Sequence, residues 1–441
     1  MKKIFLVIMT LSVLFSCSKE ILQNDSSVGG EIFSEEMGSP YRISLEDALN
    51  SLDEFLGTIE TKSSNTERKR ISDVLYIKQD KPVDTKSEDD TSCVLYVVNF
   101  EDEQGYAVLS ADTRLPVDIY AVTETGSAEE QDFYVSSQDE FNVLNLIYQS
   151  ASGNIPAVDT TVKDPEIIPI LPPEEGGQEP PEGEWVVTRW GPWYDLEAYQ
   201  KMLITQWGQG APYKDLTGAD YAGCTVVAVA QVMAYNQYPS HLNDIRMPFD
   251  TLRNMRTVSV SSVYADSVAL LFNDIYQDCG AKDYGESGSL LWPKDVVPYL
   301  ERIGYKNVKL HRNPTKFELD IVYNSITDGY PVIVSALNSD TGLGDVLKGD
   351  ANSHTWVIDG YVKQMRTGRK EGEKTGQYYG SKSETREFVH CNWGWDGDYD
   401  GYFYPGIFSK NEPAPYSAGV QLQSQGGDNY KYFYRIITYT L

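Results

Sequence analysis

The sequence has 441 residues, of which 41% are hydrophobic and 12% aromatic, and this is enough apolar material to fill two or three domains. Its 65 acidic and 37 basic side chains give a formal net charge of −28. Binding to nucleic acid and polybasic attachment to a membrane surface both depend on clustered Lys and Arg, so this balance argues against both. The 31 Tyr, 14 Phe and 8 Trp exclude a wholly disordered chain.

The N-terminal segment has the pattern of an export signal. Two lysines precede an apolar run, Ile4 to Phe15, which is shorter than the ~20 residues needed to cross a bilayer core. Ser16 and Cys17 follow, and the arrangement resembles a bacterial lipoprotein signal in which residues 1–16 are removed and Cys17 is lipidated. We therefore expect an exported protein attached to the bacterial cell envelope by a lipid on Cys17, with residues 17–39 as a flexible tether. An ordinary secretory signal with an incidental cysteine is the alternative.

The pattern of residues 40–153 predicts a small α+β domain. Ser44 and Asp47 form a capping box at the start of an amphipathic helix, which we expect to end before Gly57. Three apolar runs separated by turns predict an antiparallel meander, namely Cys93–Phe100, Tyr106–Ser110 and Val117–Val122.

Residues 154–184 predict a linker. Seven of the chain's 21 prolines fall within 26 positions of this segment, mixed with Glu and Gly. Such a segment is extended, exposed and open to cleavage. Residues 185–441 then form the last domain, which is rich in aromatic residues and glycine.

A candidate nucleophile lies in this last domain. Gly223 and Cys224 precede an apolar run that continues to Tyr235, and the run predicts a buried helix with Cys224 at its start. A helix N-terminus stabilises the thiolate over the thiol, so we expect a nucleophile that is partly ionised at neutral pH. A structural cysteine in a core helix is the alternative interpretation.

Two further segments carry candidate partners for this thiol. His354, one of four histidines, opens a strand-like run, and a second such run ends in Asn392 and Trp393. If the two strands pair, the Asn392 amide oxygen can accept the imidazole N–H and fix the ring. Gln209, in a glycine-rich turn, can donate to a developing oxyanion together with the Cys224 N–H. A satisfied surface histidine and a plain loop glutamine are the alternatives.

Taken together, these motifs resemble the streptopain family of papain-like cysteine peptidases. They are Gln209-Gly-Ala-Pro-Tyr213, Gly223-Cys224 with Ala230-Gln-Val-Met-Ala-Tyr-Asn-Gln-Tyr-Pro239, His354 with Val357-Ile-Asp-Gly360, and Asn392-Trp-Gly-Trp395. The runs Leu95–Phe100 and Gly105–Asp112 resemble that family's prosegment, so the resemblance covers roughly residues 40 to 440.

The resemblance implies an α+β chain with a two-lobed papain-like peptidase domain behind a small prodomain. It implies Cys224 as nucleophile, His354 as base, Gln209 at the oxyanion hole, and Asn392 with Trp393 around the histidine. It also implies a zymogen whose own prodomain inhibits it, protein or peptide substrates, and a preference for an apolar side chain next to the cleavage position. The chain departs from the family at residues 366–386, where we expect an inserted polar loop that forms a flexible flap.

Other interpretations remain open. The acidic turn Asp396–Gly401 begins like a calcium loop, although a solvated turn is the simpler alternative, and a zinc site from Cys224, Cys391 and two histidines fails on spacing. We expect no metal or cofactor. A catalytically inert lipoprotein that binds glycans or peptides through its aromatic surface is the main rival function. A peptidase fold that acts as an inhibitor through its first domain is a further alternative.

Overall fold

The computed structural model describes ten segments of the chain. They are residues 41–60, 69–79, 93–134, 142–154, 185–285, 288–313, 316–337, 353–372, 378–408 and 432–441. The predicted signal, tether, Cys17 and almost all of the linker lie outside them, so what the sequence indicates for these parts stays a prediction. Residues 39–441 form one compact unit. No helix within the described segments is long and apolar enough to cross a membrane.

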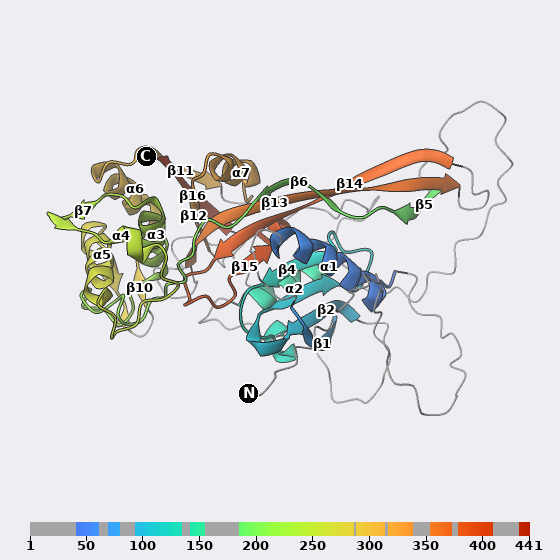
Figure 1. Ribbon diagram of the computed structural model, residues 1–441, viewed down its shortest axis with the longest axis horizontal. Helices are drawn as coiled ribbons and strands as arrows, with labels where there is room; N and C mark the ends of the chain where they lie inside the picture. Colours follow the sequence, from blue (N-terminus) through green and yellow to red (C-terminus); the bar gives the residue numbers. More distant parts are fainter. Residues whose placement is uncertain are drawn as a thin grey trace, which may run out of the picture. The chain divides into compact units, whose positions relative to one another are not determined.

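The fold class is α+β, as predicted. The described residues contain seven α-helices and a 12-stranded sheet in which every recorded pairing is antiparallel (Figure 1). The main path of this sheet has the order β1-β2-β3-β4-β15-β14-β13-β12-β16-β11, and β5 and β6 pair with β13 beside it.

The N-terminal region, residues 41–154, contains the predicted helix and meander. Its elements are α1 (Leu45–Glu60), β1 (Ile71–Lys78), β2 (Cys93–Phe100), β3 (Tyr106–Ser110), β4 (Ile119–Thr123) and α2 (Val143–Asn154). The capping box is confirmed, because Ser44 Oγ accepts the Asp47 N–H at 3.1 Å and donates to its carboxylate at 2.7 Å. The helix continues three residues past Gly57, to Glu60, and β1 and α2 were not predicted.

Helices α3 to α6 gather at one end of the sheet (Figure 1). The elements of residues 185–302 are β5 (Trp185–Trp190), β6 (Tyr194–Tyr199), α3 (Cys224–Asn236), α4 (Phe249–Leu252), α5 (Ala265–Asp278) and α6 (Pro293–Arg302). This part also contains the two-residue strands β7 (His241–Leu242), β8 (Ile245–Arg246), β9 (Lys282–Asp283) and β10 (Ser289–Leu290). Ten residues of α3 are buried, which explains why its sequence is apolar on nearly every side.

The remaining elements complete the sheet. They are β11 (Lys306–Asn313), α7 (Leu319–Thr327), β12 (Val332–Leu337), β13 (Ser353–Gly372), β14 (Tyr378–Asn392), β15 (Gly401–Phe403) and β16 (Tyr432–Thr440). Successive side chains of a strand point to opposite faces. Val357 of β13 accordingly packs with the helices, whereas Trp356 and Ile358 belong to a second core on the other face.

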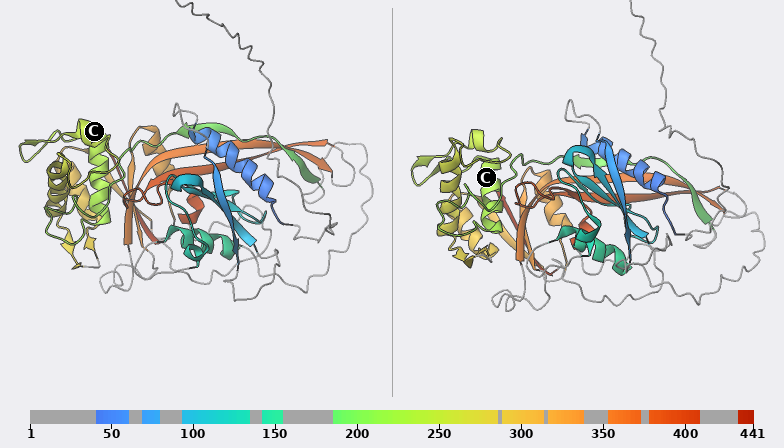
Figure 2. Two further views of the ribbon diagram at one scale, coloured as in Figure 1. Left: turned by 60° about the horizontal axis from the view of Figure 1, so that its bottom comes forward. Right: turned by 90° about the horizontal axis from the view of Figure 1, so that it is seen from below.

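The expectation of a flexible loop at residues 366–386 is wrong for the described part of this segment. β13 and β14 continue through it as a paired hairpin, and β6 and β5 pair with the other edge of β13 (Figures 1 and 2). Cross-strand pairs stabilise the hairpin: Arg366 Nε donates to Glu384, and its guanidinium lies 4.5 Å from the Trp193 ring centroid. The charged residues that suggested a loop are thus the polar faces of two long strands. The tip of the hairpin, residues 373–377, is outside the described residues.

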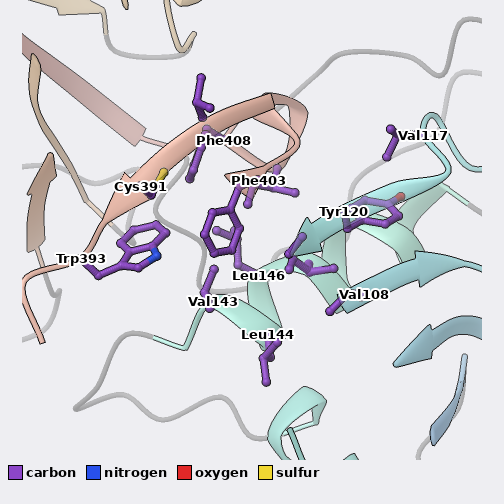
Figure 3. Close-up of a cluster of buried hydrophobic side chains, with 14 of the residues drawn as sticks. Val108, Val117, Tyr120, Val143, Leu144, Leu146, Cys391, Trp393, Phe403 and Phe408 are labelled. Atoms are coloured by element: carbon purple, nitrogen blue, oxygen red, sulfur yellow. The ribbon is translucent and has the colours of Figure 1, made fainter. Parts of the chain in front are cut away.

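The N-terminal region and the rest of the chain share one sheet and one core. β4 pairs with β15, and Gly401 lies opposite Thr123 at this junction. The second core contains Val143 of α2 together with Phe403 and Trp393, and Figure 3 shows these side chains next to one another.

Candidate active site

Cys224 is the first residue of α3, as predicted. Gly223 before it has φ 92°, and a Cβ at this position would lie 2.7 Å from the Ser289 carbonyl oxygen, so the approach to the helix requires glycine. Thr355, the residue after His354, hydrogen-bonds to the Cys224 sulfur and accepts a 2.9 Å hydrogen bond from the Thr225 hydroxyl. The start of α3 and the start of β13 are therefore in contact.

The charge state of the thiol differs from our expectation. Burial raises the pKa of Cys224, although hydrogen bonds from Thr355 and Thr225 oppose the rise. The free-energy cost of removing the thiolate from water is larger than the stabilisation that the helix N-terminus provides. The thiol form is therefore favoured in this structure. The sequence shows that Cys224 starts a helix, which predicts a lowered pKa. It does not show that distant segments cover the thiol and raise its pKa.

His354 is buried among aromatic rings. Its Nε2 lies 3.0 Å from the Trp393 carbonyl oxygen, and its ring stacks on Trp395 with centroids 4.3 Å apart. Burial lowers its pKa to about 3. Because the carbonyl oxygen accepts, Nε2 carries the hydrogen and Nδ1 is the basic nitrogen. At neutral pH both the imidazole and the Cys224 thiol are therefore uncharged.

Asn392 lies on β14 opposite Val357 of β13, so the two strands pair as expected. Its Oδ1 accepts hydrogen bonds from Gln231 Nε2 at 2.8 Å and from the Gly394 N–H at 3.2 Å. Its Nδ2 donates to the Thr205 carbonyl at 2.7 Å. These contacts hold the amide between α3 and the loop of residues 205–209, and the hydrogen bond recorded for the imidazole goes instead to the backbone of Trp393.

Gln209 lies beside the start of α3. Its carbonyl oxygen accepts the Ala222 N–H at 3.0 Å, two residues before the nucleophile candidate. The preceding Gly208 packs so closely on the Asp396 carboxylate that a Cβ would overlap it. The residue is partly exposed, and its role at an oxyanion stays a prediction, as do the individual roles of Cys224, His354, Asn392 and Trp393.

Two side chains of this hydrogen-bond network were not predicted from the sequence. Gln231 is fully buried in α3, and its one signal was a polar residue in an otherwise apolar helix. Asp400 is also buried, and its Oδ1 accepts the Trp393 N–H at 2.8 Å. Burial raises the pKa of Asp400 to about 7. Among the described residues, no group of three or more His, Cys, Asp or Glu side chains is arranged to hold a metal ion.

Comparison with known families matches residues 207–403 to the Peptidase C10 family. This part of the chain is similar to the Peptidase C10 family. The match includes all five residues proposed for the active site and the strands β11 to β15 of the large sheet. Peptidase C10, the streptopain family, consists of cysteine endopeptidases, so the protein is a hydrolase of peptide bonds. No curated protein matches the chain.

The matched C10 region contacts the N-terminal region through buried charges. His390 Nδ1 lies 2.6 Å from the Asp359 carboxylate, and its Nε2 lies 3.3 Å from the carboxylate of Glu124, which directly follows β4. Lys201 Nζ also donates to Glu124, at 2.5 Å. Burial alone would lower the pKa of His390, but the two carboxylates raise it to about 9. His390 is therefore a buried imidazolium that joins the two parts of the sheet.

A second charged contact lies on the hairpin of the C10 region. The buried Arg386 of β14 donates to Asp118 Oδ2 at 2.6 Å and to Ser51 Oγ at 2.7 Å. An aromatic ring also shields Arg386 from solvent, because its guanidinium lies 4.3 Å from the Trp193 ring centroid. The hairpin extension thus forms part of the surface on which the N-terminal region docks (Figure 2).

Proposed function

We propose that the protein is an exported cysteine endopeptidase made as a zymogen, and that it cleaves peptide bonds through a thioester on Cys224. The observation that carries this proposal is the contact between two distant segments. Thr355 hydrogen-bonds to the sulfur of Cys224 at the start of α3, and its neighbour His354 is held by the Trp393 carbonyl. This contact supports the proposal, because it joins the helix that carries the candidate nucleophile to the strand that carries the candidate base.

The chemistry follows from these groups. The Cys224 thiolate attacks the peptide carbonyl, and the developing oxyanion accepts hydrogen bonds from the Cys224 N–H and the Gln209 side chain. His354, as the imidazolium, protonates the leaving amine. Water then attacks the thioester with His354 as general base, which releases the acid and restores the thiol.

The fold supports a papain-like, two-lobed arrangement for the peptidase. Helices α3, α5 and α6 share a core on one face of β12, β13 and β16, and the aromatic residues around His354 belong to the core on the other face. We assign the helices to one lobe and the sheet to the other, with Cys224 and His354 contributed by different lobes.

Latency follows from the surroundings of both catalytic groups, since His354 is buried and Cys224 is partly buried. A thiol with a raised pKa and an imidazole with a pKa of about 3 do not form the thiolate–imidazolium pair at neutral pH. The N-terminal region shares the core that contains Trp393, and it supplies Glu124 to His390. Its departure admits water to this core, which raises the pKa of His354, lowers that of Cys224 and favours the ion pair. We therefore propose that residues 41–154 inhibit the enzyme until the linker at 154–184 is cut.

Labelling with a cysteine-directed epoxide tests the proposal. We expect one adduct, on Cys224, after the full chain has matured, and we expect Cys224→Ala to show neither peptide cleavage nor cutting within residues 154–184. Cys279→Ala is the matched control, because Cys279 is a buried thiol whose pKa burial raises to about 12. Its variant should label and mature like the wild type. Mass spectrometry reads the adduct and the new N-terminus.

Two results would contradict the proposal. Normal processing of Cys224→Ala in a purified sample would show that another protease cuts the linker. A wild-type chain that neither labels nor cleaves casein would favour the inert binding lipoprotein. Attachment to the envelope through Cys17 is a separate proposal, which a lipid-bearing N-terminal peptide would support and an unmodified secreted chain would refute.

A further inference from the structure

Gln231 is the polar exception in the helix that carries the nucleophile. It lies two turns after Cys224 and is 0% exposed, and both ends of its amide are hydrogen-bonded. Oε1 accepts the Trp207 N–H at 3.2 Å, and Nε2 donates to Asn392 Oδ1 at 2.8 Å. An apolar side chain of similar volume would fill the same space without the cost of burying an amide.

The two bonds connect three segments that carry proposed catalytic groups. Trp207 belongs to the loop that continues to Gln209, and Asn392 directly precedes Trp393, whose carbonyl holds His354. Asn392 extends the connection through its own bonds to the Thr205 carbonyl and the Gly394 N–H. The nucleophile helix, the oxyanion loop and the turn behind the imidazole thus meet at one buried pair of amides.

We propose that Gln231 is a positioning residue for catalysis, which acts through Asn392 to fix His354 and Gln209 relative to Cys224. The inference rests on the catalytic roles proposed above. It also gives the Asn392 side chain a different task from the one expected, because it supports the turn that holds the imidazole and does not itself need to touch the ring.

The expected effect is on the rate of the chemical step. Displacing a catalytic group by about 1 Å costs up to 100-fold in rate, whereas substrate contacts remote from this pair are unchanged. We expect Gln231→Met to lower kcat per active site about 10- to 100-fold with little change in KM. Asn392→Leu should cause a similar loss, and the double variant should lose no more than the larger single loss, because both remove the same connection.

The conservative variant Gln231→Glu provides a readout that a purely structural role would not change. An ionised Glu cannot donate to Asn392 Oδ1, but a protonated Glu can. We expect the kcat of this variant, relative to wild type, to rise as the pH falls and the carboxyl takes up a proton. Gln364→Met is the matched control, since Gln364 is another buried, hydrogen-bonded glutamine but lies on β13 far along the hairpin.

The assay uses the full chain after maturation, with active sites counted by epoxide titration and folding checked by thermal unfolding. If Gln231→Met does not fold, the pH dependence of Gln231→Glu decides. Wild-type kcat in a folded Gln231→Met, additive losses in the double variant, or a pH-independent ratio for Gln231→Glu would each overturn the proposal. These outcomes differ from a failure of the proposed function, in which Cys224→Ala would keep its activity.

Discussion

Two buried histidines of the same sheet have opposite charge states. His354 lies against a carbonyl oxygen and aromatic rings, and burial lowers its pKa to about 3. His390 is equally buried but lies between Asp359 and Glu124, which together raise its pKa to about 9. Burial alone therefore does not determine the protonation state of a histidine. The groups that contact its ring nitrogens determine it. The neutral histidine is the one for which we propose proton transfer, and the charged one joins two parts of the fold.

The largest expected difference between them is in catalysis. His354→Ala should lower kcat by at least about 1,000-fold, because the general acid and base is lost. His390→Ala should leave the chemistry of the matured enzyme within about tenfold of wild type. Active-site-titrated kinetics on both variants checks this, and an equally inactive His390→Ala would break the comparison.

The free energy of unfolding should show the reverse order, with the larger loss at the His390 site. Asp359→Asn removes one carboxylate from the buried imidazolium, and breaking such a pair costs about 3–5 kcal/mol. Asp359 Oδ2 also accepts the N–H groups of Met202 and Leu203, which the amide oxygen can still accept in one orientation. Urea unfolding of the full chain measures the loss. A change below about 1 kcal/mol would mean that His390 is not charged.

The pH dependence of stability sharpens the same contrast. His390 has a folded pKa of about 9, above its ordinary value of 6.5, so its contribution is fully present below about pH 6.5 and is lost as the pH rises through 9. A shift of this size corresponds to roughly 3 kcal/mol. Glu124→Gln removes one of the two carboxylates and should flatten the curve between pH 6.5 and 9. Thermal unfolding of both proteins over this range tests it, and identical curves would contradict the assignment.

The smallest effect on catalysis is expected at Asp400. Its folded pKa of about 7 lies above the ordinary value of 3.8, so wild-type stability falls as the pH rises from 4 to 7. Asp400→Asn keeps an oxygen for the Trp393 N–H but does not ionise. We expect the variant to gain stability relative to wild type across this interval, with kcat changed less than about fivefold. A constant difference between the two unfolding curves would show that Asp400 does not titrate there.

The sequence was informative where one segment determines its own structure. The runs that became β2 and β3 are apolar on both faces because both faces are buried, and their bounds were predicted to the residue. The helix start at Cys224 was likewise visible from Gly223 and the apolar run. β1 was missed because half of its side chains are exposed and one is buried, so its sequence lacks the alternation of a half-buried strand.

The charge states could not be predicted in the same way. The pKa of Cys224 and of His354 depends on how completely distant segments exclude water, and the charge on His390 depends on Glu124, which is 266 positions away. The partner of Asn392 was equally hidden, since Gln231 and Asn392 meet only through tertiary packing. Sequence motifs supplied the candidate residues of the site, and the fold determined what each of them contacts.

The pairing of β4 with β15 has a consequence for the proposed maturation of the enzyme. In the proposed matured enzyme, from which the N-terminal region has departed, Gly401–Phe403 would be the edge strand of the sheet, with main-chain donors and acceptors that Ala121–Thr123 satisfy in the full chain. An unprotected border of this kind recruits other extended chains. The proposed activation would therefore expose an unpaired strand edge, and the pairing with β4 protects the full chain from self-association through that edge.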